Sequence, residues 1–292
     1  MNNPKIAFLI LAHKDIKQLN LFINQLLDYE NSYIYVHVDK NSNLDVNKIV
    51  KNRRVKIIEE RIPVRWGDYS QIQTEALLYR TAYDDSIKYD YYSLHSGLDI
   101  AIRPIKDFAI FLQKNNKDAY IDSTPMPVKD FGGSGALERI GQEYPLFMRD
   151  KLKYKSIKRY IRAIYQRYYI IKPHKKLTDY HFGSAWNTLS SKCLGKIFEY
   201  LKNNPDFNKR FYKSLCGDEI YWNTLVNRQK KIKISKTNLR YVIFKEGGEE
   251  AGAPLTLTKD NYEAMKKTNN FFARKIETEK SSELIELLSS KE

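Results

Sequence analysis

The alternation of short apolar runs with helical repeats in the first half of the chain is the strongest constraint on its fold. Residues 6–12 are continuously apolar, which is typical of a strand buried on both faces of a sheet. Residues 15–28 follow with apolar side chains at helical spacing. The same signals predict strands at residues 33–38, 55–58, 91–94 and 119–121, and helices at residues 69–85 and about 104–114. We therefore expect an α/β fold with one Rossmann-like mixed sheet and helices on both faces.

The second half carries mixed signals and no internal repeat. It predicts a strand or a pair of strands at residues 181–189, a strand at 239–244, a short extended or irregular segment at 271–276, and helices at 192–201, Asp218–Asn227, 261–267 and 282–288. We expect one domain over residues 1–292. Glycines cluster at residues 130–141, which predicts a mobile loop. No GxGxxG or P-loop pattern follows a strand, so phosphate binding by such a loop is not predicted.

Apolar run lengths and cysteine usage predict the compartment. The run at residues 6–12 is too short to span a membrane, and no small-residue cleavage site follows it. The two cysteines, Cys193 and Cys216, form no CxxC pair, so neither a zinc site nor a disulfide framework is indicated. We expect a cytoplasmic protein.

The net charge of +15 predicts an anionic partner, whether nucleic acid, a membrane surface or a phosphorylated substrate. Residues 149–176 hold eleven Lys or Arg and one Asp, with apolar side chains at helical spacing between them. We expect residues 145–178 to form a basic amphipathic helical insertion. Its apolar stripe either enters an anionic membrane in peripheral contact or packs on the rest of the chain. A nucleic-acid-binding protein is the alternative class, but no RNP, KH or helix-turn-helix pattern supports it.

Polar residues follow the predicted strands, at the edge where the ligands of such sheets bind. They are His13 after the first strand, His37 and Asp39 at the end of the second, and Ser96, Gly97 and Asp99 after the strand at residues 91–94. We expect these side chains to border the functional site.

Several motifs together resemble the core-2/I-branching β-1,6-N-acetylglucosaminyltransferase family, which also contains the peptide O-xylosyltransferases. They are residues 6–13 (IAFLILAH) with 35–40 (YVHVDK), residues 91–99 (YYSLHSGLD), residues 182–189 (FGSAWNTL) with 217–225 (GDEIYWNTL), and residues 272–275 (FARK). Their order and spacing span residues 5–276, nearly the whole chain. The chain looks like a bacterial-type member. The resemblance implies a GT-A-like fold, an inverting mechanism and a nucleotide-sugar donor.

Inverting transfer is one in-line displacement at the anomeric carbon. It needs a general base on the acceptor hydroxyl and positive charge at the departing diphosphate. Glu219 occupies the glutamate position of the family's Pro-Asp-Glu motif, here Gly217, Asp218 and Glu219, and is the expected base. Asp218 is expected to cap the helix, or to orient its neighbour at the acceptor site. The alternative is that both carboxylates only cap a helix.

Positive charge for the diphosphate is expected from the FARK motif. Lys275 matches the lysine that contacts the donor diphosphate in the resembled family, and Arg274 is expected to assist. The family's core-2 members use a further arginine upstream of this lysine, but residues 252–254 hold none. Arg240 and Lys245 are the candidates to replace it.

The resemblance also places His37 and Asp39 near the uridine and ribose, and Asp99 near the donor sugar. The alternatives are a core histidine for His37 and a residue that closes a turn for Asp99. Trp186 is expected to form a wall of the acceptor site, since sugar C–H faces pack on indole; the alternative is a core tryptophan.

No DxD motif is present, and Asp84–Asp85 is expected at a helix end facing solvent. The core-2 branch of the resembled family works without a metal, so we expect no metal and no other cofactor. N-acetylglucosamine, transferred from a UDP-sugar with a β linkage, is the expected sugar; UDP-xylose and UDP-glucose are the alternative donors. The expected acceptor is a glycan, lipid-linked or free, in bacterial surface polysaccharide or lipooligosaccharide synthesis. The expected location is the cytoplasm, with peripheral contact at the inner face of the cell membrane.

Overall fold

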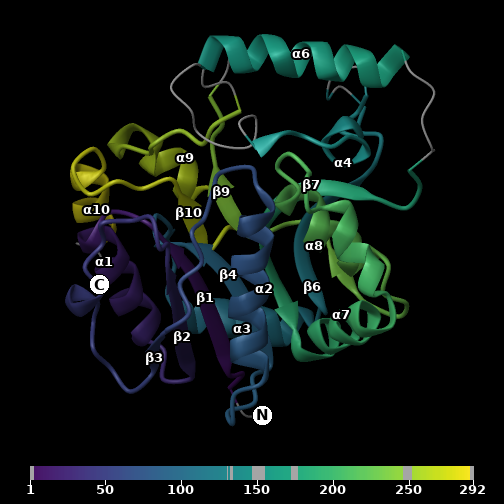
Figure 1. The fold of residues 1–292 in the computed structure, drawn as a ribbon. Helices are drawn as coiled ribbons and strands as arrows, with labels where there is room; N and C mark the ends of the chain where they lie inside the picture. The colour runs from purple at the N-terminus through teal and green to yellow at the C-terminus, as the bar shows by residue number, and fades with distance from the viewer. Residues whose placement is uncertain are drawn as a thin grey trace.

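A seven-stranded mixed sheet forms the centre of the molecule, in the strand order β3-β2-β1-β4-β7-β6-β8 (Figure 1). The computed structural model describes residues 3–129, 131, 134–146, 155–171, 177–245 and 252–289. The strands of this sheet are β1 (Ile6–Ala12), β2 (Ser32–Val38), β3 (Val55–Ile57), β4 (Tyr91–Ser96), β6 (Ala119–Pro125), β7 (His181–Ser190) and β8 (Ile234–Ser235). Strands β1 to β4 are parallel, whereas β7 runs antiparallel to both of its neighbours. The predicted α/β class with a mixed sheet is confirmed.

Helices cover both faces of this sheet, as predicted. Alternate residues of β1 point to opposite faces: Ala7 and Leu9 join the core beneath α2, α7 and α8, whereas Ile6, Phe8 and Ile10 join the core beneath α1 and α3. The helices are α1 (Ile16–Leu27), α2 (Tyr69–Tyr83), α3 (Ile105–Asn115), α4 (Glu138–Gly141), α6 (Lys155–Ile171), α7 (Ser191–Asn203), α8 (Asp218–Asn227), α9 (Tyr262–Lys266) and α10 (Ser282–Ser289). Short 3₁₀ helices lie at Val46–Lys48, Pro205–Arg210 and Lys259–Asn261.

A second sheet of three strands, which the sequence patterns do not predict, holds the C-terminal segments together. Its order is β5 (Ile100–Ala101), β10 (Phe272–Arg274) and β9 (Arg240–Val242). The cluster beside it includes Ile100, Leu257, Ala273 and Leu284, which are all buried. This sheet fixes the FARK motif next to the turn that follows β4, because Ala273 pairs with Ile100.

β7 is one strand of ten residues, where the sequence left open a strand or a pair of strands. Its partner β6 extends four residues beyond the predicted strand, into polar positions that apolar patterning does not detect. The ladder between them shifts register between Ile121 and Ser123. Gly183 lies at this shift, and a Cβ there would stand 1.7 Å from the Asp122 carbonyl oxygen. Only glycine therefore lets the two backbones approach so closely.

Two helices, α4 and α6, lie within the segment between β6 and β7. The predicted mobile loop at residues 130–141 ends in the helical turn α4, where Gly141 donates to the Leu137 carbonyl at 2.8 Å and Ile140 is buried, so this part is not a loop. α6 supplies the predicted helix within residues 145–178; residues 147–154 and 172–176 lie outside the described part of the chain. The single domain and the insertion boundaries stay predictions. No helix in the described ranges is both long and apolar enough to cross a membrane.

Candidate active site

The carboxyl ends of β1, β2 and β4 lie at one end of the large sheet, towards α6 (Figure 1). Lys14, Asp39 and Asp99 follow these three strands. Because β7 is antiparallel to β4, its first half, with Trp186, lies at this same end. Ligands of open α/β sheets bind outside the carboxyl ends of the strands, so this edge is the candidate active site.

Asp99 lies at the centre of a buried charged cluster. Its side chain has no exposed area, and its Oδ2 accepts a hydrogen bond from His95 Nδ1 at 3.0 Å. Arg240 Nε lies 3.9 Å from Asp99 Oδ2, and Arg274 Nε lies 3.8 Å from Asp99 Oδ1. Two guanidinium groups around one carboxylate leave an excess of positive charge at this edge of the sheet.

The pKa values in this cluster follow from burial and from these neighbours. Burial alone would raise the pKa of Asp99, but the hydrogen bond from His95 and the charges of Arg274 and Arg240 outweigh it, so the pKa of Asp99 is lowered. Burial, together with the Arg240 charge, lowers the pKa of His95 to about 4. At neutral pH the cluster therefore holds a carboxylate, a neutral histidine and two cations, which suits an anionic ligand.

Arg274 connects this cluster to Trp186. Its guanidinium carbon lies 4.2 Å from the centre of a Trp186 ring, a cation–π contact. The Arg274 side chain is mostly buried, yet its Nε and Nη1 have no hydrogen-bond partner among the described residues. Unsatisfied donors at a buried charge are costly, so a ligand oxygen in reach of them would bind favourably. Trp186 is partly exposed beside Arg274 rather than enclosed in the core.

Lys275 belongs to a group of lysines around one carboxylate, Glu277. Lys275 Nζ lies 2.7 Å from Glu277 Oε1, Lys14 Nζ lies 2.6 Å from the same oxygen, and Lys280 Nζ lies 3.2 Å from Oε2. The hydrogen bonds from Lys14 and Lys275 strongly lower the pKa of Glu277. Three cations on one carboxylate leave positive charge to spare. We call Lys14, Lys275 and Lys280 the lysine group.

Glu219 is the second residue of α8 and pairs with a residue that the sequence analysis missed, Arg139 of α4. The Glu219 carboxylate accepts a hydrogen bond from Arg139 Nη1. Burial opposes the charge on Arg139, but Glu219 outweighs it and raises the pKa of the guanidinium. Arg139 also lies 5.0 and 5.1 Å from the rings of Phe131 and Phe182. Gly217 replaces the family's proline at a point where a Cβ would stand 2.3 Å from Ser214 Oγ.

Asp218 differs from Glu219 in its surroundings. It is buried, its Oδ1 has no hydrogen-bond partner among the described residues, and it makes no side-chain cap for α8. Burial, and then the charge of Glu219, raise the pKa of Asp218. Glu75 of α2 lies nearby and is also buried; burial and then the charge of Asp218 raise its pKa well above the ordinary value. Trp222 Nε1 donates to Glu75 Oε2 at 2.7 Å. The backbone N–H groups of Asp218 and Glu219 lower the pKa of the Asp218 carboxyl in part, so Asp218 still contacts the first turn of α8, although α8 has no side-chain cap at Gly217.

His37 and Asp39 hold the loop that follows β3. The Ile62 backbone N–H donates to His37 Nε2 at 2.9 Å, and burial lowers the pKa of His37 to about 4. Asp39 Oδ1 accepts from the backbone N–H groups of Asn41 and Val64, at 2.9 and 3.0 Å. This placement favours the core-histidine alternative for His37, while Asp39 remains partly exposed at the end of β2.

The first half of β7 joins the two groups of candidate residues. Trp186 contacts Arg274, as described above, and its backbone N–H donates to Ser184 Oγ at 3.2 Å. The Asn223 side-chain amide of α8 donates to the carbonyl oxygens of Ser184 and Glu219, both at 3.0 Å. β7 therefore lies between the predicted base on one side and the predicted diphosphate ligands on the other.

Sequence reasoning missed the residues that act through tertiary contacts. Arg139 lies 80 positions from Glu219, and Lys14 lies 263 positions from Glu277, so no local spacing could reveal either pair. Arg240, a candidate to replace the family's upstream arginine, lies against Asp99 and donates to the backbone of Leu94. Asp85 is also corrected: its carboxylate accepts from Tyr35 Oη at 2.8 Å instead of facing solvent, although Asp84 is exposed.

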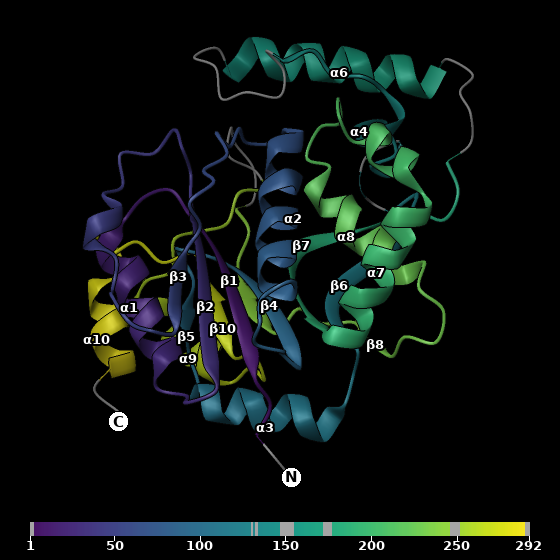
Figure 2. The ribbon, with the colours of Figure 1, turned by 60° about the horizontal axis from the view of Figure 1, so that its bottom comes forward.

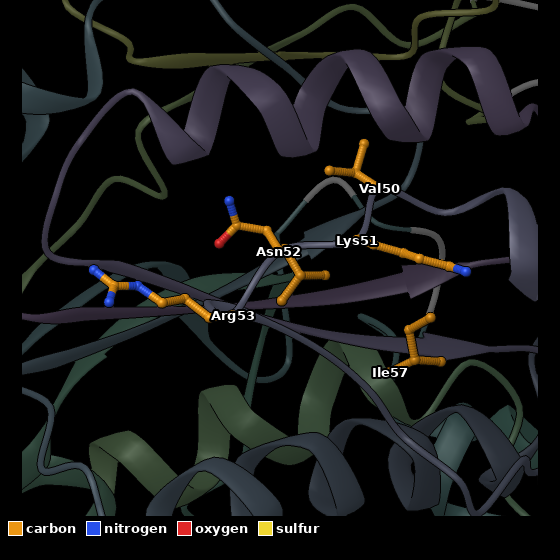
Figure 3. A pocket seen from close by; sticks show the side chains of 6 residues that line it. Val50, Lys51, Asn52, Arg53 and Ile57 are labelled. Carbon is orange, nitrogen blue, oxygen red and sulfur yellow. The ribbon is translucent and has the colours of Figure 1, made fainter.

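A hollow of about 510 Å³ on the edge strand β3 lies apart from this site (Figure 3). It is lined by Val50, Lys51, Asn52, Arg53, Val55 and Ile57. Lys51 and Arg53 point away from each other in Figure 3, so they do not converge on one anion. Within the described ranges, no group of three or more His, Cys, Asp or Glu side chains is placed to hold a metal ion.

Comparison with known proteins identifies the family. The model of the core-2/I-branching enzyme family matches residues 6–280. The fold also resembles 4-diphosphocytidyl-2C-methyl-D-erythritol synthase from Anaerococcus prevotii (10% identity, 69% of this chain and 78% of that chain, TM-score 0.35). It also resembles 2-C-methyl-D-erythritol 4-phosphate cytidylyltransferase from Thermus thermophilus (9% identity, 80% of this chain and 89% of that chain, TM-score 0.35). Likenesses of this size do not bear on the activity. No curated protein sequence matches the chain.

An α/β sheet whose carboxyl edge carries clustered cations and a partly exposed carboxylate suits an enzyme that handles an anionic, nucleotide-linked substrate. The chain belongs to the core-2/I-branching enzyme family, since the family model covers most of its length. It is a glycosyltransferase with a GT-A-like fold.

Proposed function

We propose that the protein is an inverting glycosyltransferase that moves a sugar from a UDP-sugar to a hydroxyl of a glycan. The observation that carries this proposal is the arrangement around the first half of β7, with Glu219 on one side and Arg274 and Lys275 on the other. Glu219 is 38% exposed, as a base that meets an acceptor needs to be. Family membership supports a nucleotide-sugar donor and a glycan acceptor.

The proposed reaction is a single displacement. The acceptor oxygen attacks the anomeric carbon while the bond from that carbon to the diphosphate oxygen breaks, and Glu219 takes the proton of the acceptor hydroxyl. Arg139 keeps the Glu219 carboxylate in place before the acceptor arrives. The departing UDP carries negative charge, which Lys275 and Arg274 stabilise. Trp186, held by Arg274, offers a ring face on which a sugar can pack.

We propose that the lysine group supplies the charge that a metal supplies in other glycosyltransferases. Lys14 is the candidate for the second diphosphate cation, because it shares Glu277 with Lys275 and follows β1 at the carboxyl edge of the sheet. The carboxylate holds the ammonium groups together, and the group retains positive charge for an incoming diphosphate. Arg240, by contrast, is committed to the Asp99 cluster.

The finer assignments extend this proposal. The donor sugar is N-acetylglucosamine, transferred to give a β linkage, with UDP-xylose and UDP-glucose as alternative donors of the same reaction. His37 and Asp39 lie at the uridine end of the site, with His37 acting through the backbone it holds. Asp99 holds the guanidinium group of Arg274 in position, and Asp218 borders the acceptor side next to Glu219. The acceptor belongs to a bacterial surface polysaccharide or lipooligosaccharide, built at the inner face of the cell membrane.

The test is a donor screen that measures UDP release from UDP-N-acetylglucosamine, UDP-xylose and UDP-glucose, with glycan acceptors present and absent. We expect release to be fastest with UDP-N-acetylglucosamine and to depend on the acceptor, and the new linkage to be β by NMR. An α-linked product would contradict inversion, and no release from any UDP-sugar with any acceptor would contradict the proposal as a whole.

A further inference from the structure

The helix α6 carries a row of exposed apolar side chains. Ile157, Tyr160, Ile164 and Tyr168 are 55%, 71%, 50% and 54% exposed. Their spacing of three, four and four residues places them along one side of the helix. We call these four residues the outer stripe. Scattered apolar residues on a surface are ordinary, but a contiguous row of large ones marks an interaction site.

Two other apolar residues of α6, Ile161 and Tyr165, pack against the buried cluster of Tyr144, Leu215 and Cys216 and attach the helix to the rest of the molecule. The rings of Tyr144 and Tyr165 stack at 5.8 Å. The apolar residues of α6 are therefore divided between an inner set, Ile161 and Tyr165, that packs on the domain and an outer set of side chains that are half exposed or more.

Basic residues are frequent in the sequence on both sides of the outer stripe and between its members. Residues 149–176 carry eleven Lys or Arg and a single Asp. On the helix itself, Arg167 is exposed one residue before Tyr168. A helix with an apolar stripe and an excess of Lys and Arg is typical of segments that lie in the interface of an anionic membrane.

α6 lies beyond the carboxyl ends of the parallel strands, at the same end of the molecule as the candidate active site (Figures 1 and 2). Its inner residues contact Cys216, three positions before Glu219, and the Gln142 side chain donates to the Tyr165 carbonyl at 2.8 Å. A surface that binds the outer stripe would thus be held close to the predicted base.

We propose that α6 docks the enzyme on an anionic lipid surface, with the outer stripe in the interface and basic residues of the helix, Arg167 among them, at the headgroups. The inference rests on the proposed function, because the role of docking is to bring the active site to a lipid-anchored acceptor. A nucleic acid or a free anionic polysaccharide would satisfy the charges but would leave the exposed isoleucine and tyrosine side chains in water. The lipid interface satisfies both features at once.

Flotation with vesicles tests the apolar part of the proposal. The triple variant Ile157→Gln, Tyr160→Gln and Ile164→Gln removes exposed apolar surface while keeping good helix formers on α6. The matched control is Leu287→Gln on α10, another exposed apolar residue on a helix. On vesicles of phosphatidylcholine mixed with phosphatidylglycerol, we expect the triple variant to partition at least about tenfold more weakly, since three large side chains no longer enter the interface. The control is expected to float as the unchanged protein does.

Charge reversal tests the electrostatic part. We expect Arg159→Glu with Arg167→Glu to weaken partitioning by roughly 30-fold or more, from about 1 kcal/mol for each basic residue near an anionic surface. Lys106→Glu with Lys114→Glu changes the net charge equally, but on α3, at the end of the molecule opposite α6 (Figure 2). Arg162 stays unchanged, because its guanidinium lies 5.7 Å from the Trp66 ring and helps to hold α6.

The outcomes separate this inference from the proposed function. Equal flotation on vesicles of phosphatidylcholine alone, or no flotation on either kind, would overturn the docking proposal. Retention on an anionic polysaccharide or on DNA without flotation would overturn it as well, and would assign the charges to that polymer. UDP release with a soluble acceptor is expected to be the same for every α6 variant and for the unchanged protein. The absence of UDP release from all of them, the unchanged protein included, would instead count against the proposed function.

Discussion

At the scale of single residues, Glu219 has to be held in place and yet remain reachable. Arg139 and the first turn of α8 hold it, and its 38% exposure leaves it accessible. Glu219→Gln keeps the shape and the hydrogen bonding of the side chain but removes the base. We expect turnover to fall on the order of 10²–10⁴-fold, with the affinity for UDP unchanged in calorimetry. Glu143→Gln, an exposed carboxylate paired with Lys213, is the control and should retain full activity. Near-normal turnover of Glu219→Gln would show that another group is the base.

Lys275 differs from its neighbour Lys280 in exposure, although both pair with Glu277. The Lys275 side chain is 26% exposed and that of Lys280 is 70% exposed. We expect Lys275→Ala to weaken UDP binding by ~1.5–3 kcal/mol and to slow turnover, because a diphosphate loses a charge-assisted hydrogen bond. Lys280→Ala removes the same charge from a more exposed position and should have a smaller effect. Equal affinities for UDP in the two variants, measured by calorimetry, would contradict this assignment.

Glu75 makes the stability of the protein depend on pH. Folding raises the pKa of this carboxyl above its ordinary value of 4.5, so its contribution to stability is complete below about pH 4.5 and is lost as the pH rises towards the folded pKa. Glu75→Gln retains an acceptor for Trp222 Nε1 and has no charge to desolvate. We expect the stability of the variant relative to the unchanged protein to increase from about pH 5 to about pH 8, measured by urea unfolding. Glu199→Gln, at an exposed position, should show no such trend.

Residues that belong to a local motif were predictable from the sequence, and residues that meet only in the folded chain were not. Asp218, Glu219, Arg274 and Lys275 stand in recognisable short motifs, and the structure places them at the carboxyl edge or beside β7. Arg139 has no such motif. Its hydrogen bond to Glu219 depends on where the fold places α4 relative to α8, which only the complete fold determines.

At the scale of elements, β7 is the structural link between the two halves of the site, and its close approach to β6 depends on Gly183. A Cβ at this position would collide with the Asp122 carbonyl oxygen, a backbone atom that cannot turn away as a flexible side chain could. We expect Gly183→Ala to destabilise the fold by at least about 2 kcal/mol in urea unfolding, at the upper part of the range for overpacking. Unchanged stability would mean that the register shift between β6 and β7 relaxes freely.

The same strands show where sequence patterns predict elements well and where they do not. β1 was predicted residue for residue, because a continuous apolar run is what burial on both faces requires. The polar half of β6 and the three short strands of the second sheet were not predicted as a sheet. Their pairing joins Phe272 to Ala101 and Arg240, segments far apart in the sequence, so the hydrogen bonding is set by tertiary structure.

At the scale of the whole molecule, positive charge is concentrated in two places. One is the carboxyl edge of the sheet, where Lys14, Arg274 and Lys275 come together from opposite ends of the chain. The other is residues 149–176, where the charge follows directly from composition. The second was visible in the sequence as a basic segment. The charge at the carboxyl edge was visible only in part. In the sequence Lys14 is a single lysine after a strand, and only the fold brings Glu277 against it.

This distribution of charge leads to the last prediction, which is that transfer does not need a metal ion. A diphosphate leaving group must be neutralised as it departs, either by a divalent cation or by side-chain cations. Here three lysines share one carboxylate, and Arg274 adds a largely buried guanidinium with unsatisfied donors. We therefore expect UDP release and product formation to continue at the same rate in excess EDTA, and added Mn²⁺ or Mg²⁺ to change it little. The same assay on Lys14→Ala should show slower transfer that divalent cations do not restore. Complete loss of transfer on chelation, with recovery on adding either ion, would contradict the prediction and would mean that the lysine group only assists a metal-dependent reaction.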